Sequence, residues 1–217
     1  MEFLIYLLLL LIDSTLGIYY YRRLTKAFQC LTQLIVITFL FELISESLIQ
    51  TSIITSNFPF YHVLLPIQLL YSALIYFHVL KEINQNGKLL LPFTLLLVVI
   101  SILISIFYQN SSSFPTYGSL ILSLFIIGNA LFLYFKLMKF PTEVPILKQG
   151  FFWFNSGNFF FYAVTFFVFG YFEYAQGPKQ ITPAWISILI KVSSYILYSC
   201  LGLSLYFVAL NKTNGRN

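Results

Sequence analysis

Charged residues are scarce in this chain, and this scarcity limits its possible folds more than any other feature. Of 217 residues, 9% are charged and 59% are hydrophobic. Apolar stretches recur at about 20 residues, the length that a helix rising ~1.5 Å per residue needs to cross ~30 Å of hydrocarbon. Seven such stretches follow one another and leave no length for a soluble domain. The sequence therefore predicts an integral membrane protein.

The expected fold is all-α: a polytopic bundle of seven transmembrane helices that form a single transmembrane domain over residues 1–217. Helices are favoured over a β-barrel because runs such as Leu7 to Ile12 do not alternate between apolar and polar residues, as barrel strands do. The connections are short and polar. We expect the spans at about 3–21, 28–49, 60–80, 89–108, 117–138, 150–172 and 183–210.

Lysine and arginine are divided unevenly between the two ends of these spans. Basic loops stay on the cytoplasmic side of a membrane, so we predict a cytoplasmic (inner) membrane protein with its N-terminus outside and its C-terminus inside. The net charge of +5 is explained by this bias and by the attraction of basic residues to anionic lipid, so it does not call for a nucleic-acid partner. The outer side holds Lys179, and the inner side holds Arg22, Arg23, Lys26, Lys81, Lys88, Lys136, Lys139, Lys148, Lys212 and Arg216.

The order of the spans allows an internal repeat. Spans one to three and five to seven cross in the same direction, so a parallel 3+1+3 duplication is geometrically allowed. Residues 69–74 resemble residues 196–201 at an offset of 127, which also aligns Glu46 with Glu173. The uncharged fourth span, residues 89–108, would then connect the two halves.

Polar side chains inside the spans mark the candidate site. A charge at mid-bilayer costs ~2.5–3.5 kcal/mol on insertion scales, so it normally faces the protein interior or water. Counted from the outer ends at ~1.5 Å per residue, polar groups of four helices reach a layer ~10–15 Å deep, while Glu46 lies only ~5 Å deep. The four groups are Asp13, Glu42, Gln68 and Lys191, and Ser187 and Tyr195 share the helix face of Lys191.

This layer predicts an outward-facing polar pocket for a small polar solute. Glu42 and Glu46 lie one turn apart, and Lys191 supplies an opposite charge. This arrangement suits a proton-coupled or cation-linked carrier, or a receptor for a small polar ligand. The same groups equally fit interhelical pairing that holds the bundle together. A secondary polar stripe on the sixth span has the same two interpretations, and consists of Asn155, Asn158, Tyr162 and Thr165.

Two functions remain open at this point. The first is binding and translocation of a small solute. The second is a sensory, receptor or accessory subunit that acts through a partner membrane or signalling protein, since no cytoplasmic output domain is present. An enzyme is less favoured because no His-Glu-x-x-His, Gly-x-Ser-x-Gly or phosphate-loop motif occurs, although a hydrolase built on Asp13 and Glu42 remains open. We predict no cofactor. We also predict no metal site, because His62 and His78 fall at opposite membrane boundaries and cannot share a metal ion.

Glu42, His62 and residues 152–162 resemble seven-helix bacterial inner-membrane proteins to which no activity is assigned. The layout is also similar to that of SWEET-type sugar carriers. Pro66-Ile67-Gln68 departs from the proline-glutamine signature of those carriers, so their sugar site is not carried over.

The topology also resembles that of microbial opsins, which hold retinal on a lysine of the last helix. Here Lys191 lies in the outer part of that helix, Ser187 stands where opsins have an aspartate, and Gln68 replaces a counter-ion in span three. A retinal binder is therefore the least favoured alternative.

Overall fold

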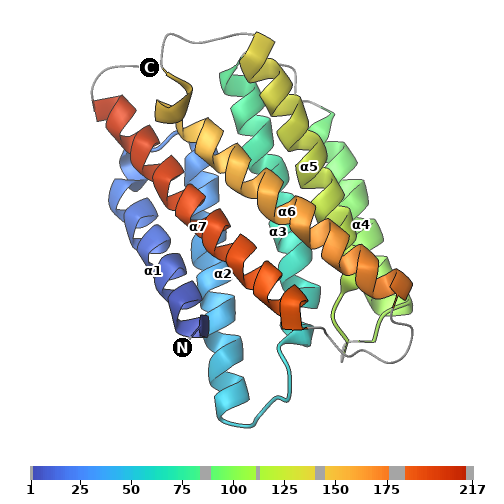
Figure 1. Cartoon of the computed structure of the whole chain (residues 1–217). Helices are drawn as coiled ribbons and strands as arrows, with labels where there is room; N and C mark the ends of the chain where they lie inside the picture. The colour runs from blue at the N-terminus through green and yellow to red at the C-terminus, as the bar shows by residue number, and fades with distance from the viewer. Residues whose placement is uncertain (1, 84–88, 111–112, 140–144, 176–183, 214–217) are drawn as a thin grey trace. The chain divides into compact units, whose positions relative to one another are not determined.

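A computed structural model describes residues 2–83, 89–110, 113–139, 145–175 and 184–213 (Figure 1). In these ranges every regular element is helical, which confirms the predicted class. Lys88, Lys179 and Arg216, which entered the orientation argument, lie outside the described residues. The elements are α1 (Glu2–Tyr20), η1 (Tyr21–Arg23), α2 (Lys26–Gln50), α3 (Phe58–Glu82), α4 (Leu90–Phe107), α5 (Thr116–Lys139), η2 (Ile146–Lys148), α6 (Gly150–Ala175) and α7 (Ala184–Thr213).

Six of the described helices, all but α6, are long and apolar enough to cross a membrane. On α4, Leu95, Leu96 and Val99 are each more than half exposed, as expected of a helix that faces lipid. The chain is therefore a multi-pass membrane protein. Helix α6 has 26 residues, but Asn155 and Asn158 in its first half lower its apolar character. The seventh span stays a prediction.

The helices belong to two compact units. The first, called here the α1–α7 unit, contains residues 1–25 and 123–217, and so includes α1, most of α5, α6 and α7. The second, the α2–α4 unit, contains residues 26–122. These boundaries differ from those of the predicted 3+1+3 repeat, which would group α1 with α2 and α3. The repeat remains a prediction.

Within the α1–α7 unit, the first and last helices pack together and run parallel (Figure 1). The rings of Tyr6 and Tyr198 lie with centroids 5.4 Å apart. Further along both helices, Asp13 meets Gly202: a Cβ added at position 202 would lie 2.6 Å from Asp13 Oδ1. Residue numbers rise together on the two helices, so their directions agree.

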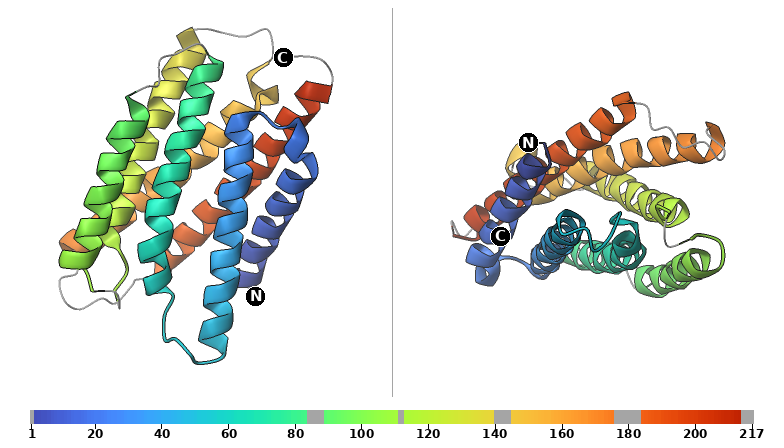
Figure 2. Two further views of the ribbon diagram at one scale, coloured as in Figure 1. Left: turned by 180° about the vertical axis from the view of Figure 1, so that it is seen from behind. Right: turned by 90° about the horizontal axis from the view of Figure 1, so that it is seen from below.

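Helix α6 packs on α7 in the opposite direction, and two glycines let the backbones approach (Figure 2). A Cβ at Gly157 would lie 2.7 Å from Cys200 Cβ, and a Cβ at Gly150 would lie 2.7 Å from the Ser204 carbonyl oxygen. Because the glycines are seven residues apart, they share one helix face. Small residues at such a contact are typical of helix packing in membranes.

In the α2–α4 unit, consecutive helices pack antiparallel around α3. The rings of Phe41 and Phe60 lie 6.1 Å apart at the junction of α2 and α3. Pro66 lies inside α3 and is buried. Its missing N–H leaves the carbonyl of His62 without the usual helical donor. The affected carbonyl directly follows Tyr61, which bonds Glu42.

Candidate functional site

Asp13 is the most unusual polar residue of the α1–α7 unit. It lies eleven residues from the start of α1, or ~16 Å along a helix, which is near the middle of a ~30 Å hydrocarbon layer. Its side chain is 3% exposed, and its Oδ2 atom has no hydrogen-bond partner among the described residues. Buried polar atoms are normally bonded. The carboxyl group therefore keeps unused bonding capacity in the protein interior.

The neighbourhood of Asp13 is built from small and aromatic residues. Gly202 has no side chain, so the carboxyl group of Asp13 can lie against the backbone of α7. One turn before Gly202, Tyr198 stacks edge-on with Tyr6. Ser14, 4% exposed, also has an unpartnered hydroxyl among the described residues. This region can accept a ligand that offers hydrogen bonds or a positive charge.

Lys191 lies far from this carboxyl group. It precedes Gly202 by eleven residues on α7, or ~16 Å along the helix axis, which is too far for an ion pair with Asp13. The Lys191 side chain is exposed, whereas Ser187 and Tyr195 are half-buried. The predicted pairing of Lys191 with Glu42 joins residues of different units and stays a prediction.

Glu42 in the α2–α4 unit is held by a defined partner. Its side chain is 5% exposed, and the Tyr61 hydroxyl donates a hydrogen bond of 2.7 Å to its Oε1 atom. The Tyr61 ring in turn lies 5.4 Å from that of Phe114. Glu46 is half-buried and accepts a 3.1 Å hydrogen bond from Gln50 Nε2. Both glutamates of α2 therefore have protein donors.

Gln68 lies on the same face of α3 as Tyr61. The seven-residue spacing places it ~10 Å further along that helix, and its side chain is half-buried. Glu42, Tyr61 and Gln68 thus belong to one unit, while Asp13 and Lys191 belong to the other. The predicted four-helix pocket remains a prediction. Sequence reasoning did not identify Tyr61 as the partner of Glu42.

The polar stripe of α6 lies on its buried face. Asn155 donates a 2.9 Å hydrogen bond to the Ala130 carbonyl of α5. Asn158 and Thr165 each donate to a carbonyl of their own helix, both at 2.8 Å, and Tyr162 is 9% exposed. Of these bonds, the one from Asn155 joins two helices, as the helix-packing interpretation expects.

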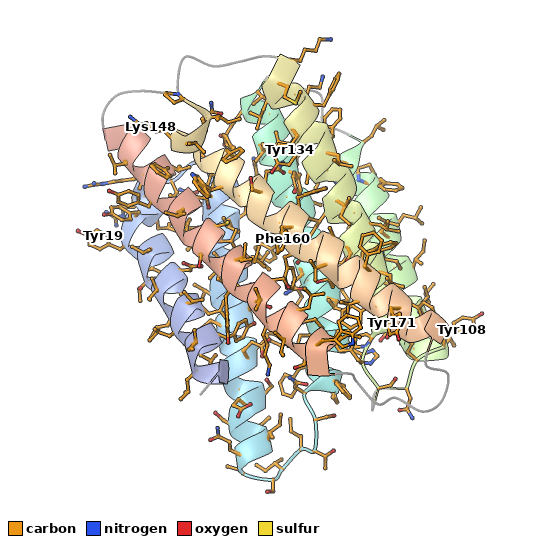
Figure 3. All side chains as sticks on the ribbon, viewed as in Figure 1. Tyr19, Tyr108, Tyr134, Lys148, Phe160 and Tyr171 are labelled. Atoms are coloured by element: carbon orange, nitrogen blue, oxygen red, sulfur yellow. The ribbon has the colours of Figure 1, made fainter. Side chains whose placement is uncertain are left out.

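A hydroxyl chain strengthens the contact between α5 and α6. The Ser156 hydroxyl donates to the Phe152 carbonyl at 2.8 Å, so it accepts the 2.7 Å bond from the hydroxyl of Tyr134. Figure 3 labels Tyr134. The Tyr134 ring also lies 6.1 Å from that of Phe159. Helix α6 is thereby bonded to α5, and its glycines pack on α7.

His62 connects α3 to α4 and to the segment after it. Its Nε2 atom lies 3.0 Å from the Ser113 carbonyl, which can only accept, so Nε2 carries the proton. The Nδ1 atom is paired with the Ser105 hydroxyl. The sequence placed His62 at a span boundary but gave no sign of these partners.

No three histidine, cysteine, aspartate or glutamate side chains gather into a metal site within the part of the chain that the structure describes. No protein-family model, curated protein or solved structure matches the chain.

Proposed function

We propose that this protein binds a small polar solute within the membrane and moves it across, with Asp13 as the central binding group. The observation that carries the proposal is a carboxyl group, 3% exposed, whose Oδ2 atom has no partner among the described residues. A purely structural carboxyl group would be expected to hold a donor from a neighbouring helix, as Glu42 does. Asp13 instead keeps its bonding capacity for a ligand.

The parallel packing of α1 on α7 supports seven spans. If α1 crosses from outside to inside, a parallel α7 crosses in the same sense, so the chain between them crosses an odd number of times. Helices α2 to α5 are four candidate spans, and α6 would be the fifth crossing. The antiparallel contact of α6 with α7 agrees with this count. Together with the basic loops, it favours an N-terminus outside and a C-terminus in the cytoplasm.

The proposal is tested by transport in liposomes. Purified protein is reconstituted, a proton gradient is imposed, and uptake of a panel of radiolabelled sugars, amino acids and small organic ions is measured. We expect at least one class to accumulate above the level of empty liposomes, and Asp13→Asn to lower that accumulation at least tenfold. Glu82→Gln removes an exposed carboxylate at the end of α3 and is the matched control, with uptake unchanged.

Two results would overturn the proposal. One is that no class in the panel accumulates although the protein is folded and inserted. The other is that wild-type and Asp13→Asn proteins accumulate a solute equally.

A further inference from the structure

We infer that Asp13 is a proton-exchanging site and that the proton is the ion coupled to solute movement. This inference rests on the proposed function and names its coupling ion. It starts from the same carboxyl group, which lies at mid-helix and 3% exposed between α1 and α7. A bare carboxylate so far from water needs a counter-charge or hydrogen-bond donors, and the described residues provide no donor for Oδ2.

No cation on the helices packed against Asp13 provides the counter-charge. Helix α7 and the short helix η1 both contact α1, the helix that carries Asp13. Lys191 on α7 is ~16 Å along the axis from Gly202, and Arg22 and Arg23 are at least ~13 Å along the chain axis from Asp13. Arg23 lies 6.0 Å from the Tyr20 ring, and both arginines are exposed. Lys212, ten residues after Gly202 on α7, is ~15 Å along the axis from that glycine. Among the described parts of α1, η1 and α7, these four residues are the cations to consider.

The other titratable groups on this face are tyrosines. Tyr6 lies two turns before Asp13 on α1, and Tyr198 lies one turn before Gly202 on α7. Both carry neutral phenol groups at physiological pH. They leave the charge of Asp13 unbalanced, and they form an aromatic layer between it and the start of α1.

A metal cation fits this site poorly. Hard cations take about six or more oxygen ligands. Helix α1 continues unbroken from Glu2 to Tyr20, so its backbone carbonyls around Asp13 are engaged in helical bonds. The Thr15 hydroxyl bonds the Ile12 carbonyl as well. Among the described residues of α1 around Asp13, the oxygens that keep bonding capacity are those of Asp13, Ser14 and the Thr15 hydroxyl, which suffice for a proton and fall short of a metal shell.

The exchange is a simple acid–base step. A hydronium ion that reaches the site from one side transfers a proton to Oδ2: one of its O–H bonds breaks, an O–H bond forms on Asp13, and neutral Asp13 and a water molecule remain. Release to water on the other side breaks that bond and restores the carboxylate. Gly202 has no side chain, and this allows the Asp13 carboxyl group to lie against the backbone of α7.

The test exploits the fact that Asp13 is the single aspartate of the chain. Protein made by cell-free synthesis with aspartate labelled with carbon-13 at the side-chain carboxyl reports on this group alone, without any mutation. Infrared spectra of the labelled protein in liposomes are recorded as the pH is stepped from acidic to alkaline, in choline chloride and in sodium chloride. We expect a label-sensitive carboxylic-acid band that disappears as the pH is raised and is indifferent to sodium. Asp13→Asn should remove the band and Glu82→Gln should leave it.

Each alternative result is decisive. A labelled group that remains a carboxylate throughout overturns the inference, and so does a band that sodium abolishes, because the site would then take a metal cation. If the acid band is present but no solute accumulates, the proton site stands and the proposed transport function fails. If solute uptake depends on Asp13 but the acid band is absent, transport stands and proton coupling fails.

Discussion

The two carboxyl groups that are buried among the described residues, those of Glu42 and Asp13, have opposite surroundings. Glu42 in the α2–α4 unit accepts a hydrogen bond from Tyr61, whose ring is itself packed on Phe114. Asp13 in the α1–α7 unit is similarly buried, yet its Oδ2 atom has no partner in the part of the chain that the structure describes, and its carboxyl group lies against Gly202. A partnered acid stabilises its helix pair, whereas an unpartnered one is retained at a cost in stability. The comparison contrasts an acid that is bonded to a neighbouring helix with one whose Oδ2 atom has no partner among the described residues, and the proposed binding role rests on this contrast.

The largest effect is expected when the space beside Asp13 is filled. Gly202→Val places a side chain where a Cβ already lies 2.6 Å from Asp13 Oδ1. Overpacking of this kind costs about 1–3 kcal/mol, and solute uptake in liposomes should be lost. Gly128→Val on α5 is the control, because a Cβ there meets nothing within 4 Å. If Gly202→Val and Gly128→Val were equally stable in denaturant titration, the close contact between Asp13 and Gly202 would be contradicted.

A smaller loss is expected at the partnered acid. Tyr61→Phe removes the hydroxyl that donates to Glu42 while keeping the ring against Phe114. Interhelical hydrogen bonds in membranes are worth about 0.6 kcal/mol on average and up to about 1.7 kcal/mol, so a loss of that size is expected in unfolding measurements. A variant as stable as the wild type would show that Glu42 does not depend on Tyr61.

The smallest effect on stability is expected at Asp13 itself. Asp13→Asn removes a charge but no observed hydrogen bond to Oδ2, so stability should stay within about 0.5 kcal/mol of the wild type or rise. Uptake should fall sharply in the same variant. A loss of stability larger than that of Tyr61→Phe would reverse the comparison and assign Asp13 a structural role.

Helix positions could be predicted from sequence alone because hydrocarbon thickness fixes their length. Each predicted span agrees within three residues at each end with a described helix, as for 89–108 against Leu90–Phe107. The contact between Asp13 and Gly202 could not be predicted. Periodicity shows which residues share a face of one helix, but it does not show which helix that face meets.

The same limit explains why the polar stripe predicted for α7 differs from the face that this helix buries. Its pattern grouped Ser187, Lys191 and Tyr195 on one polar stripe, yet the face that α7 buries runs through Ser193, Leu197, Leu201 and Ser204. In a membrane, serine and leucine can both lie on a packed face, so polarity alone does not separate the two sides. The exposed position of Lys191 follows from packing that the sequence does not state.

The pairing of the first helix with the last also has a consequence for synthesis. More than 160 residues separate the end of α1 at Tyr20 from the start of α7 at Ala184. At about 5–20 residues per second, α1 waits on the order of ten to thirty seconds before α7 emerges. Throughout that interval Asp13 must reside in the bilayer without its final neighbour. Whatever shelters the nascent helix, whether lipid, a proton or the insertion machinery, sets how reliably the finished protein assembles.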